Sequence, residues 1–351
     1  MRKFIYILFF AVITVASVQA GNPDRQGESG APQLLINPWA RSAGVSNMTV
    51  ASCRGVESMH INPAGGARIK NMEFNVAHTR YFDGADIGVT AFGFAKTIGK
   101  GGAMTLSVMS VNVGQIPVTT EQVPEGTGAT FTPSIGNIAA GYSHTFFNKV
   151  SVGAVFRGVN ESTRDVSAFA LAIDAGVQYV SGKDDNFKFG IALRNVGAPL
   201  HFVGQGLSIA SANPSGQITY SLTNEKRTQA VQLPSTLSIG ASYDVLFGKK
   251  SRLSFLGQFT SNSFSRDNIG GGLEFNLNNM FAVRGAYRYE VGVTPKSIAA
   301  PVVTGISGGF SVDFPIRKEN NETKSALGID YSYQQTNIWK GNHTLSIRLG
   351  F

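Results

Sequence analysis

The chain has 351 residues, a formal net charge of +8, one cysteine and only 15% charged residues. A single cysteine excludes an internal disulfide, and the positive charges are scattered singly rather than gathered into the runs that bind nucleic acid. The 41 glycines, 24 phenylalanines and 10 tyrosines are typical of a β protein with tight turns.

Residues 1–20 have the composition of a cleavable signal peptide. Two basic residues precede an apolar stretch over residues 4–15, and Val18-Gln19-Ala20 supplies small residues at the cleavage positions. We therefore predict an exported chain whose mature form begins at Gly21. The alternative is an uncleaved helical anchor, which the short apolar run does not favour.

The segment 21–70 shows no strand pattern, and we predict that it forms an N-terminal hatch. It contains a small-residue run at 40–51 and ends in His60-Ile61-Asn62-Pro63-Ala64-Gly65-Gly66. Asn-Pro initiates turns, and paired glycines permit positive φ or close backbone approach. Taken alone, this string could be a plain turn that leads into the first strand.

From residue 72 onward, apolar and polar residues alternate in runs of about ten residues, the length that crosses a bilayer when a strand is tilted. The predicted strands are 72–80, 86–97, 102–113, 134–146, 149–159, 166–180, 187–196, 234–245, 251–261, 267–277, 280–290, 304–315, 324–335 and 342–351. Fourteen is an even number, as in single-chain bacterial barrels. In the first three strands, an apolar patch and a change of face near Met109 predict β-bulges or contact with the lead segment.

The last strand is the clearest. Leu345, Ile347, Leu349 and Phe351 share one face, and polar residues occupy the other. A bare edge strand invites aggregation, so we predict that this strand closes a ring by pairing with residues 72–80. A terminal phenylalanine strand is also typical of the insertion signal of bacterial outer-membrane proteins. The sequence thus predicts an all-β, fourteen-stranded antiparallel transmembrane barrel over residues 71–351 in a bacterial outer membrane.

The connections distinguish this barrel from a water-soluble sandwich, which can show the same alternation. The three longest, 114–133, 197–233 and 291–303, all fall at one end, and the other end receives only short turns. This asymmetry is that of outer-membrane barrels.

Catalytic, metal and cofactor signals are weak, and we predict a protein that is not an enzyme. The Gly-x-Ser-x-Gly string at 305–309 lies within a strand rather than at a strand–turn–helix elbow, and the five histidines lack metal-ligand spacing. Several charged residues are instead predicted to face the lumen as a network of ion pairs: Asp174, Arg194, Arg284, Arg288, Asp313, Asp330 and Arg348.

The hatch string Asn62, Pro63, Ala64, Gly65 resembles that of the outer-membrane family that contains the fatty-acid channel FadL and the PorV/PorQ proteins. Further similarity to PorV/PorQ lies in 168–176, 190–197 and 233–243, so that the resemblance covers most of the mature chain. The family commonly has an aromatic residue where this chain has Ile61.

The resemblance implies a component of the type IX secretion system. A PorV-like barrel would receive cargo from the translocon, and a PorQ-like barrel would anchor an attachment subunit. The expected partners are therefore membrane lipid and either the translocon, the attachment complex or a cargo signal domain. The long outer loops would bind them, with Leu207, Ile209, Lys226 and Arg227 as candidate residues.

Two other functions remain open: a FadL-like channel for hydrophobic small molecules, and a structural barrel without transport. A continuous apolar tunnel beside a kinked third strand would favour the channel. A lumen filled by residues 21–70 and charged side chains, with projecting loops, would favour secretion.

Overall fold

The computed structural model describes residues 21–212, 221–248, 250–293, 301–319 and 322–351, so the predicted signal peptide lies outside the described residues. Fifteen strands form one antiparallel sheet, and fourteen of them make a closed ring, to which the two-residue β10 adds at one edge. The ring consists of β1 (Met72–Tyr81), β2 (Ile87–Ile98), β3 (Gly102–Asn112), β6 (Ser134–Phe146), β7 (Val150–Ser162), β8 (Ser167–Ser181), β9 (Phe187–Gly197), β13 (Thr236–Phe247), β14 (Ser251–Asn262), β15 (Asn268–Leu277), β16 (Phe281–Glu290), β17 (Val303–Glu319), β18 (Glu322–Thr336) and β19 (Asn342–Gly350). The predicted fold class is confirmed.

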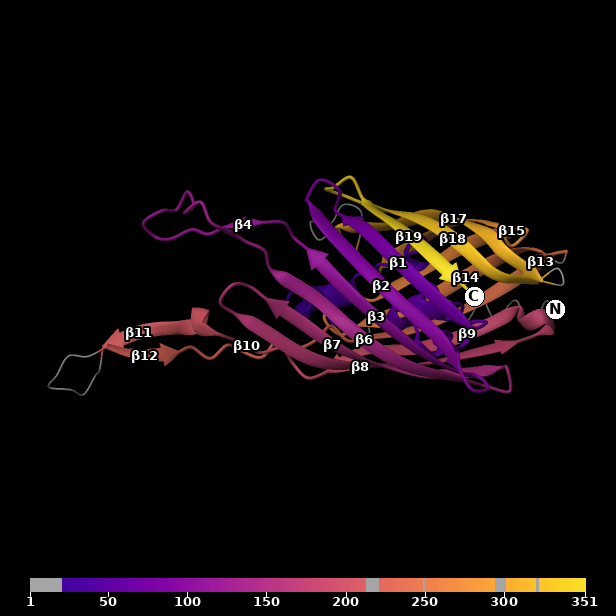
Figure 1. Ribbon diagram of the computed structural model, residues 1–351, viewed down its shortest axis with the longest axis horizontal. Helices are drawn as coiled ribbons and strands as arrows, with labels where there is room; N and C mark the ends of the chain where they lie inside the picture. The colour runs from indigo at the N-terminus through magenta and orange to yellow at the C-terminus, as the bar shows by residue number, and fades with distance from the viewer. Residues whose placement is uncertain (1–20, 213–220, 249, 294–300, 320–321) are drawn as a thin grey trace.

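The ring closes between the last strand and the first (Figure 1). Ile347 lies opposite Val76 in the β1–β19 ladder, and the backbone N–H of Phe351 donates to the carbonyl of Met72 at 2.9 Å. Every edge of the ring is therefore paired, as the alternating terminal strand predicts.

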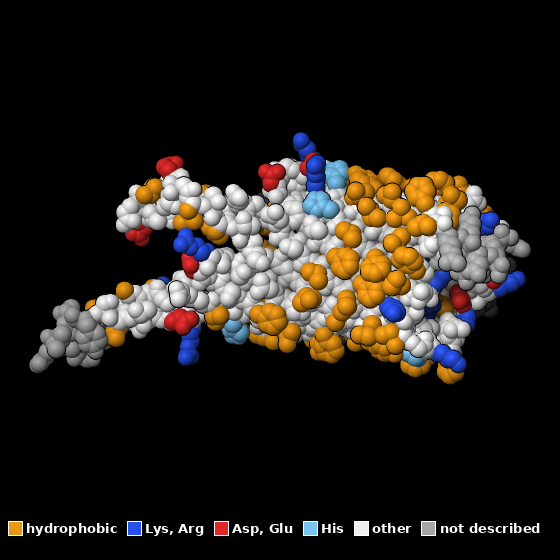
Figure 2. Space-filling view, in the orientation of Figure 1, with side chains coloured by type: hydrophobic (Ala, Val, Ile, Leu, Met, Phe, Trp, Pro, Cys, Tyr) orange, Lys and Arg blue, Asp and Glu red, His pale blue; other side chains and the backbone are white. Residues whose placement is uncertain are grey.

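The two faces of the wall differ as the alternation requires. Leu345 and Ile347 are 49% and 50% exposed on the outside, whereas Thr344 and Ser346 are buried inside. Figure 2 shows apolar side chains covering much of the wall, with charged groups confined mainly to its two ends and to the projections. Such a large exposed apolar belt is unfavourable in water and favourable in lipid, so the barrel spans a membrane.

The two ends of the barrel differ in the length of their connections. One end, here called the inner end, carries short turns such as 99–101, 147–149 and 182–186. At the other, the outer end, two hairpins project well beyond the wall (Figure 1). They are β4 (Ile116–Pro117) with β5 (Thr130–Phe131), and β11 (Ser208–Ala212) with β12 (Ser221–Glu225); β10 (Phe202–Val203) lies at the base of the second.

The prediction of bulges in the first three strands is wrong, and the alternative of contact with the lead segment is right. The β1–β2, β2–β3 and β3–β6 ladders run without a register shift. Met109 and Val111 face inward because they pack against Trp39 of the lead segment. The apparent change of face in the sequence therefore reflects an apolar patch on the lumen side.

The hatch fills the lumen with short elements. Three of them begin at a proline, and the glycines and other small residues of this segment disfavour longer helices. The elements are η2 (Pro23–Arg25), η3 (Pro32–Leu35), α2 (Ala40–Ala43), η4 (Gly55–His60) and η5 (Pro63–Ala67). In the described part of the chain, no helix has the length and apolarity needed to cross a membrane.

Candidate functional site: a sealed lumen with a cavity at its rim

Asn62 fastens the hatch to the wall. Its side chain is fully buried, and its amide nitrogen lies 2.8 Å from the carbonyl oxygen of Val50, 3.0 Å from that of Val177 and 3.3 Å from that of Ile191. Its Oδ1 accepts from the backbone N–H of Ala64 at 3.1 Å. One side chain therefore ties the hatch turn to β8 and β9.

The residues around Asn62 require a close backbone approach. A Cβ on Gly153 of β7 would overlap the carbonyl of Pro63, and a Cβ on Gly176 of β8 would overlap Oδ1 of Asn62. Gly65 has the same role within the hatch, where a Cβ would overlap the carbonyl of Cys53. Gly65 and Gly66 have no positive φ, so glycine serves here to allow close backbone approach rather than an unusual backbone conformation.

Apolar packing adds to this attachment. Trp39 is 1% exposed and lies in a cluster with Val56, Ala91 and Met109, which joins the hatch to β2 and β3. A Cβ on Gly93 would overlap Val56, so this glycine provides the space into which the hatch packs. Burial of a tryptophan in such a cluster stabilises by about 3–5 kcal/mol relative to alanine.

Charged residues on the lumen wall form ion pairs, as predicted for most of the set. Asp174 pairs with Arg157 at 2.9 Å, Arg284 with Glu274 at 3.0 Å, and Arg348 with Asp313 at 2.7 Å. Arg157 and Glu274 are not among the predicted residues, although both lie on the inward face of their strands. Nη2 of Arg157 also donates to the carbonyl of Met59 at 2.7 Å, so this pair contacts the hatch.

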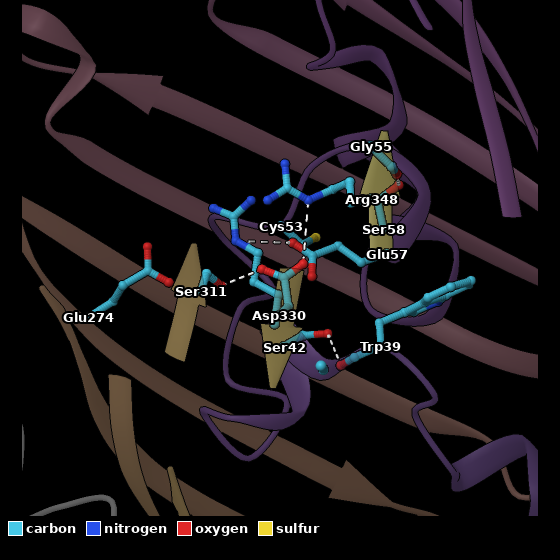
Figure 3. Close-up of polar contacts among 12 residues, drawn as sticks. Trp39, Ser42, Cys53, Gly55, Glu57, Ser58, Glu274, Ser311, Asp330 and Arg348 are labelled. Atoms are coloured by element: carbon cyan, nitrogen blue, oxygen red, sulfur yellow. Dashed lines mark hydrogen bonds and ion pairs between the residues drawn. The ribbon is translucent and has the colours of Figure 1, made fainter. Parts of the chain in front are cut away.

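Charged residues of the hatch also lie near charged residues of the opposite wall (Figure 3). Glu57 of η4 lies 3.9 Å from Arg41 of α2, and in Figure 3 it points toward Asp330 and Arg348 of β18 and β19. Arg348 pairs with Asp330 at 3.5 Å, and the hydroxyl of Ser311 donates to the same carboxylate. Burial raises the pKa of Glu57, which Arg41 partly opposes.

The hatch divides the lumen into two chambers. The inner chamber has a volume of about 190 Å³ and is lined by Arg54 and Glu57 of the hatch, with Lys188 and Asp244 of the wall. The outer chamber has a volume of about 300 Å³, and Met48 and Ile61 of the hatch contribute to its lining. The two chambers share no lining residue.

A larger cavity, of about 610 Å³, lies at the outer rim where the pairing between β16 and β17 ends. The β16–β17 ladder ends at the pair Tyr287–Ile306, although β16 continues to Glu290. Tyr287 and Tyr289 line the cavity from the lipid-facing side of β16, while Arg288 and Glu290 line it from the lumen side. We call this space the rim cavity.

The rim cavity is largely aromatic and aliphatic at its outer surface and polar at its inner surface. Its other lining residues include Tyr81, Phe82, Val293, Val302, Asn268 and Gln335. Tyr81, Asn268, Arg288 and Glu290 also line the outer chamber. The rim cavity and the outer chamber are therefore adjacent, and the arrangement can take an apolar molecule with a few polar contacts.

The predicted loop residues lie on the second hairpin, far from the lumen. Ile209 is 43% exposed on β11, and Lys226 and Arg227 follow β12 at the surface. The backbone N–H of Lys226 donates to the carbonyl of Leu207 at 2.9 Å, which closes the base of the hairpin. No side chain that the structure describes belongs to a group of three His, Cys, Asp or Glu able to hold a metal ion.

Comparison with known proteins relates the chain to other barrels through structure rather than sequence. No family model matches the sequence, and no curated protein matches it either. Among solved structures, it is similar to the CymD monoaromatic hydrocarbon channel, with a TM-score of 0.54, 14% identity, and coverage of 90% of this chain and 98% of that one. The toluene transporter TbuX of Ralstonia pickettii gives a TM-score of 0.53, 13% identity, and coverage of 90% and 98%.

A FadL homologue of Pseudomonas aeruginosa gives a TM-score of 0.50, 11% identity, and coverage of 89% and 97%. At such identities the likeness shows the fold. The chain is a fourteen-stranded transmembrane barrel with an N-terminal hatch, and its fold is FadL-like. The likeness supports this broader resemblance and does not support the narrower one to PorV/PorQ.

Proposed function

We propose that this protein is an outer-membrane channel for hydrophobic small molecules, in which the hatch keeps the lumen closed until a ligand enters. The observation that carries the proposal is the rim cavity, which borders lipid-facing tyrosines on one side and the outer chamber on the other. An apolar molecule can partition there from the outer leaflet, because aromatic side chains at the interface offer both apolar surface and hydrogen-bonding groups. The hydrocarbon channels of similar fold support this assignment.

This route differs from the one considered from the sequence, in which a channel would show an apolar tunnel beside a kinked third strand. In the structure β3 pairs without interruption, and the lumen is filled by the hatch and ion pairs. The cavity lies instead at the rim, where the β16–β17 ladder ends. Passage to the inner end therefore requires the hatch to move, which gives the docking contacts of Asn62 a role in transport.

The test is uptake of a labelled monoaromatic hydrocarbon, such as toluene, by cells that lack their own channel and express this chain. Replacing both Tyr81 and Tyr289 by alanine should lower uptake about tenfold, since two aromatic contacts contribute on the order of 1–3 kcal/mol. Tyr142→Ala is the matched control, because Tyr142 is 52% exposed on β6 and does not line the rim cavity. Uptake by the wild type at the level of empty cells would refute the channel.

A role in protein secretion is a second candidate, favoured by the hairpin β11–β12 that projects from the outer end (Figure 1). The hairpin carries exposed Ile209, with Lys226 and Arg227 at its base, and such a surface suits a partner of the type IX secretion system. The filled lumen is also consistent with a barrel that does not conduct small molecules.

Replacing residues 208–225 with two glycines tests this candidate. A longer deletion from residue 200 would also remove Leu200, which is fully buried in the cluster that packs Leu34 of the hatch against β8. The shortened barrel should remain heat-modifiable on a gel and should lose any protein that co-purifies with the wild type. An unchanged set of co-purifying proteins would exclude the hairpin as the partner site.

A further inference from the structure

The start of the described chain lies against the outer end of the barrel. The backbone N–H of Gly30 donates to the carbonyl of Gln232 at 2.9 Å, and the guanidinium of Arg25 lies 4.1 Å from the ring centre of Phe264. Gln232 belongs to the connection before β13 and Phe264 to the turn between β14 and β15, both at the outer end. Because β1 begins at the inner end, residues 21–71 extend through the lumen from one end to the other.

Gly21 also contacts the outer end. Its backbone nitrogen lies 2.6 Å from Oδ2 of Asp267, a residue that is 3% exposed, and Oδ1 of the same carboxylate accepts from the N–H of Asn262 at 3.2 Å. A Cβ at position 21 would meet Oδ1 of Asp267 at 2.6 Å and its backbone nitrogen at 2.7 Å. Only glycine fits this position, and the group directed at the carboxylate is the nitrogen of the predicted first residue.

We propose that removal of the leader after Ala20 creates the group that locks the hatch in place. Hydrolysis breaks the Ala20–Gly21 peptide bond: water supplies a hydroxyl to the Ala20 carbonyl and a proton to the Gly21 nitrogen. The resulting α-amine takes a further proton near neutral pH, because such amines have a pKa of about 8. The α-ammonium then forms an ion pair with the buried carboxylate of Asp267, which is stronger than the bond that an amide N–H makes there.

The position of Gly21 also determines the order of leader removal and hatch seating. A leader held at the inner membrane during export leaves the chain on the inner side of the barrel, whereas the seated Gly21 lies at the outer end. The hatch therefore seats after cleavage, and the new N-terminus marks a processed chain. The lock forms whatever molecule the barrel transports.

The experiment measures modification of the N-terminal amine of the barrel purified from outer membranes. An amine-reactive ester is applied at pH 7, and the labelled fraction of the N-terminal peptide is read by mass spectrometry. We expect the purified chain to begin at Gly21. Its N-terminal amine should react at least about tenfold more slowly in the folded barrel than in the urea-unfolded chain. This ratio corresponds to about 1.4 kcal/mol of protection. Asp267→Asn should remove this protection, and Asp165→Asn, in an exposed loop at the same end, should not.

A mature chain that begins elsewhere, or equal protection in the wild type and Asp267→Asn, would overturn the proposal. Ala20→Arg, which removes the small residue needed for cleavage, provides an independent measurement. Its heat-modifiable form should expose the buried thiol of Cys53 in the hatch to a maleimide. Protection of Cys53 as in the wild type would contradict the order of cleavage and seating, and if this variant does not insert, the result with Asp267→Asn decides.

Discussion

Asn62→Ala should release the hatch without opening the ring of strands. The substitution removes the donors to the carbonyls of Val177 and Ile191, which stay buried in the wall. It also removes a donor to the carbonyl of Val50 within the hatch, which keeps its bond from Gln178. Each hydrogen bond contributes on the order of 1 kcal/mol, and each abandoned buried acceptor costs more, so we expect the seated hatch to lose about 2–4 kcal/mol relative to the released hatch. This corresponds to an increase of about 30- to 1000-fold in the released fraction.

Cys53 provides the assay, because it is the one cysteine of the sequence and is 1% exposed beside the backbone of Asn62. Burial raises the pKa of its thiol, so the seated hatch keeps it in the unreactive form. Maleimide labelling of the purified barrel should therefore accelerate by the same factor in Asn62→Ala. Asn186→Ala, in an exposed turn at the inner end, is the matched control. A labelling rate within a factor of about three of the wild-type rate would refute this role of Asn62. Such a ratio corresponds to a difference of less than about 0.7 kcal/mol in the free energy of hatch release.

Three further predictions concern the wall, the pH dependence and the ring closure. Asp174→Asn should destabilise the barrel in urea by about 3–5 kcal/mol, because it leaves Arg157 buried without its counter-ion. Asp185→Asn, in an exposed pair, should change stability by less than about 1 kcal/mol. Similar losses of stability in both variants would contradict the role of burial. Burial and the nearby Arg157 and Arg194 lower the pKa of His60 well below its usual value. The stability that neutral His60 gives to the seated hatch is therefore present above the unfolded-state pKa of about 6.5 and is lost as the pH falls through the pKa of the folded state. Cys53 accessibility, read after a pulse at each pH and quenching at a common pH, should therefore rise on acidification, and His60→Gln should abolish the rise while His201→Gln, at an exposed position, should not. Deletion of Phe351 removes its paired hydrogen bonds with Met72 and should lower the yield of heat-modifiable barrel in outer membranes. An unchanged yield would indicate that the ring closes elsewhere.

The fold could be predicted because its main signal is local. A period of two places Leu345 and Ile347 outside and Thr344 and Ser346 inside whatever the rest of the chain does. The distribution of long and short connections is likewise visible in the chain order. The choice between a bulge in β3 and contact with the lead segment could not be made from the sequence. Alternation shows which residues share a face, but not that Met109 and Val111 face a hatch.

The site could be predicted only in part. The hatch string could be recognised, but the use of Asn62 depends on carbonyls of Val177 and Ile191, which lie 115 and 129 residues further along the chain. The ion-pair partners Arg157 and Glu274 went unrecognised because an inward charge on a strand does not indicate which opposite charge the curvature of the barrel brings near it.

The sequence by itself therefore determined the ring of strands, its apolar exterior and the position of its closing strand, since these follow from the alternation of neighbouring side chains and from the need to pair every edge. Only the tertiary structure decided how the lumen is sealed, where the β16–β17 ladder ends and which carboxylate meets Gly21. Those features arise where segments a hundred or more residues apart meet, and the polar groups there select partners by distance and geometry that no local pattern records.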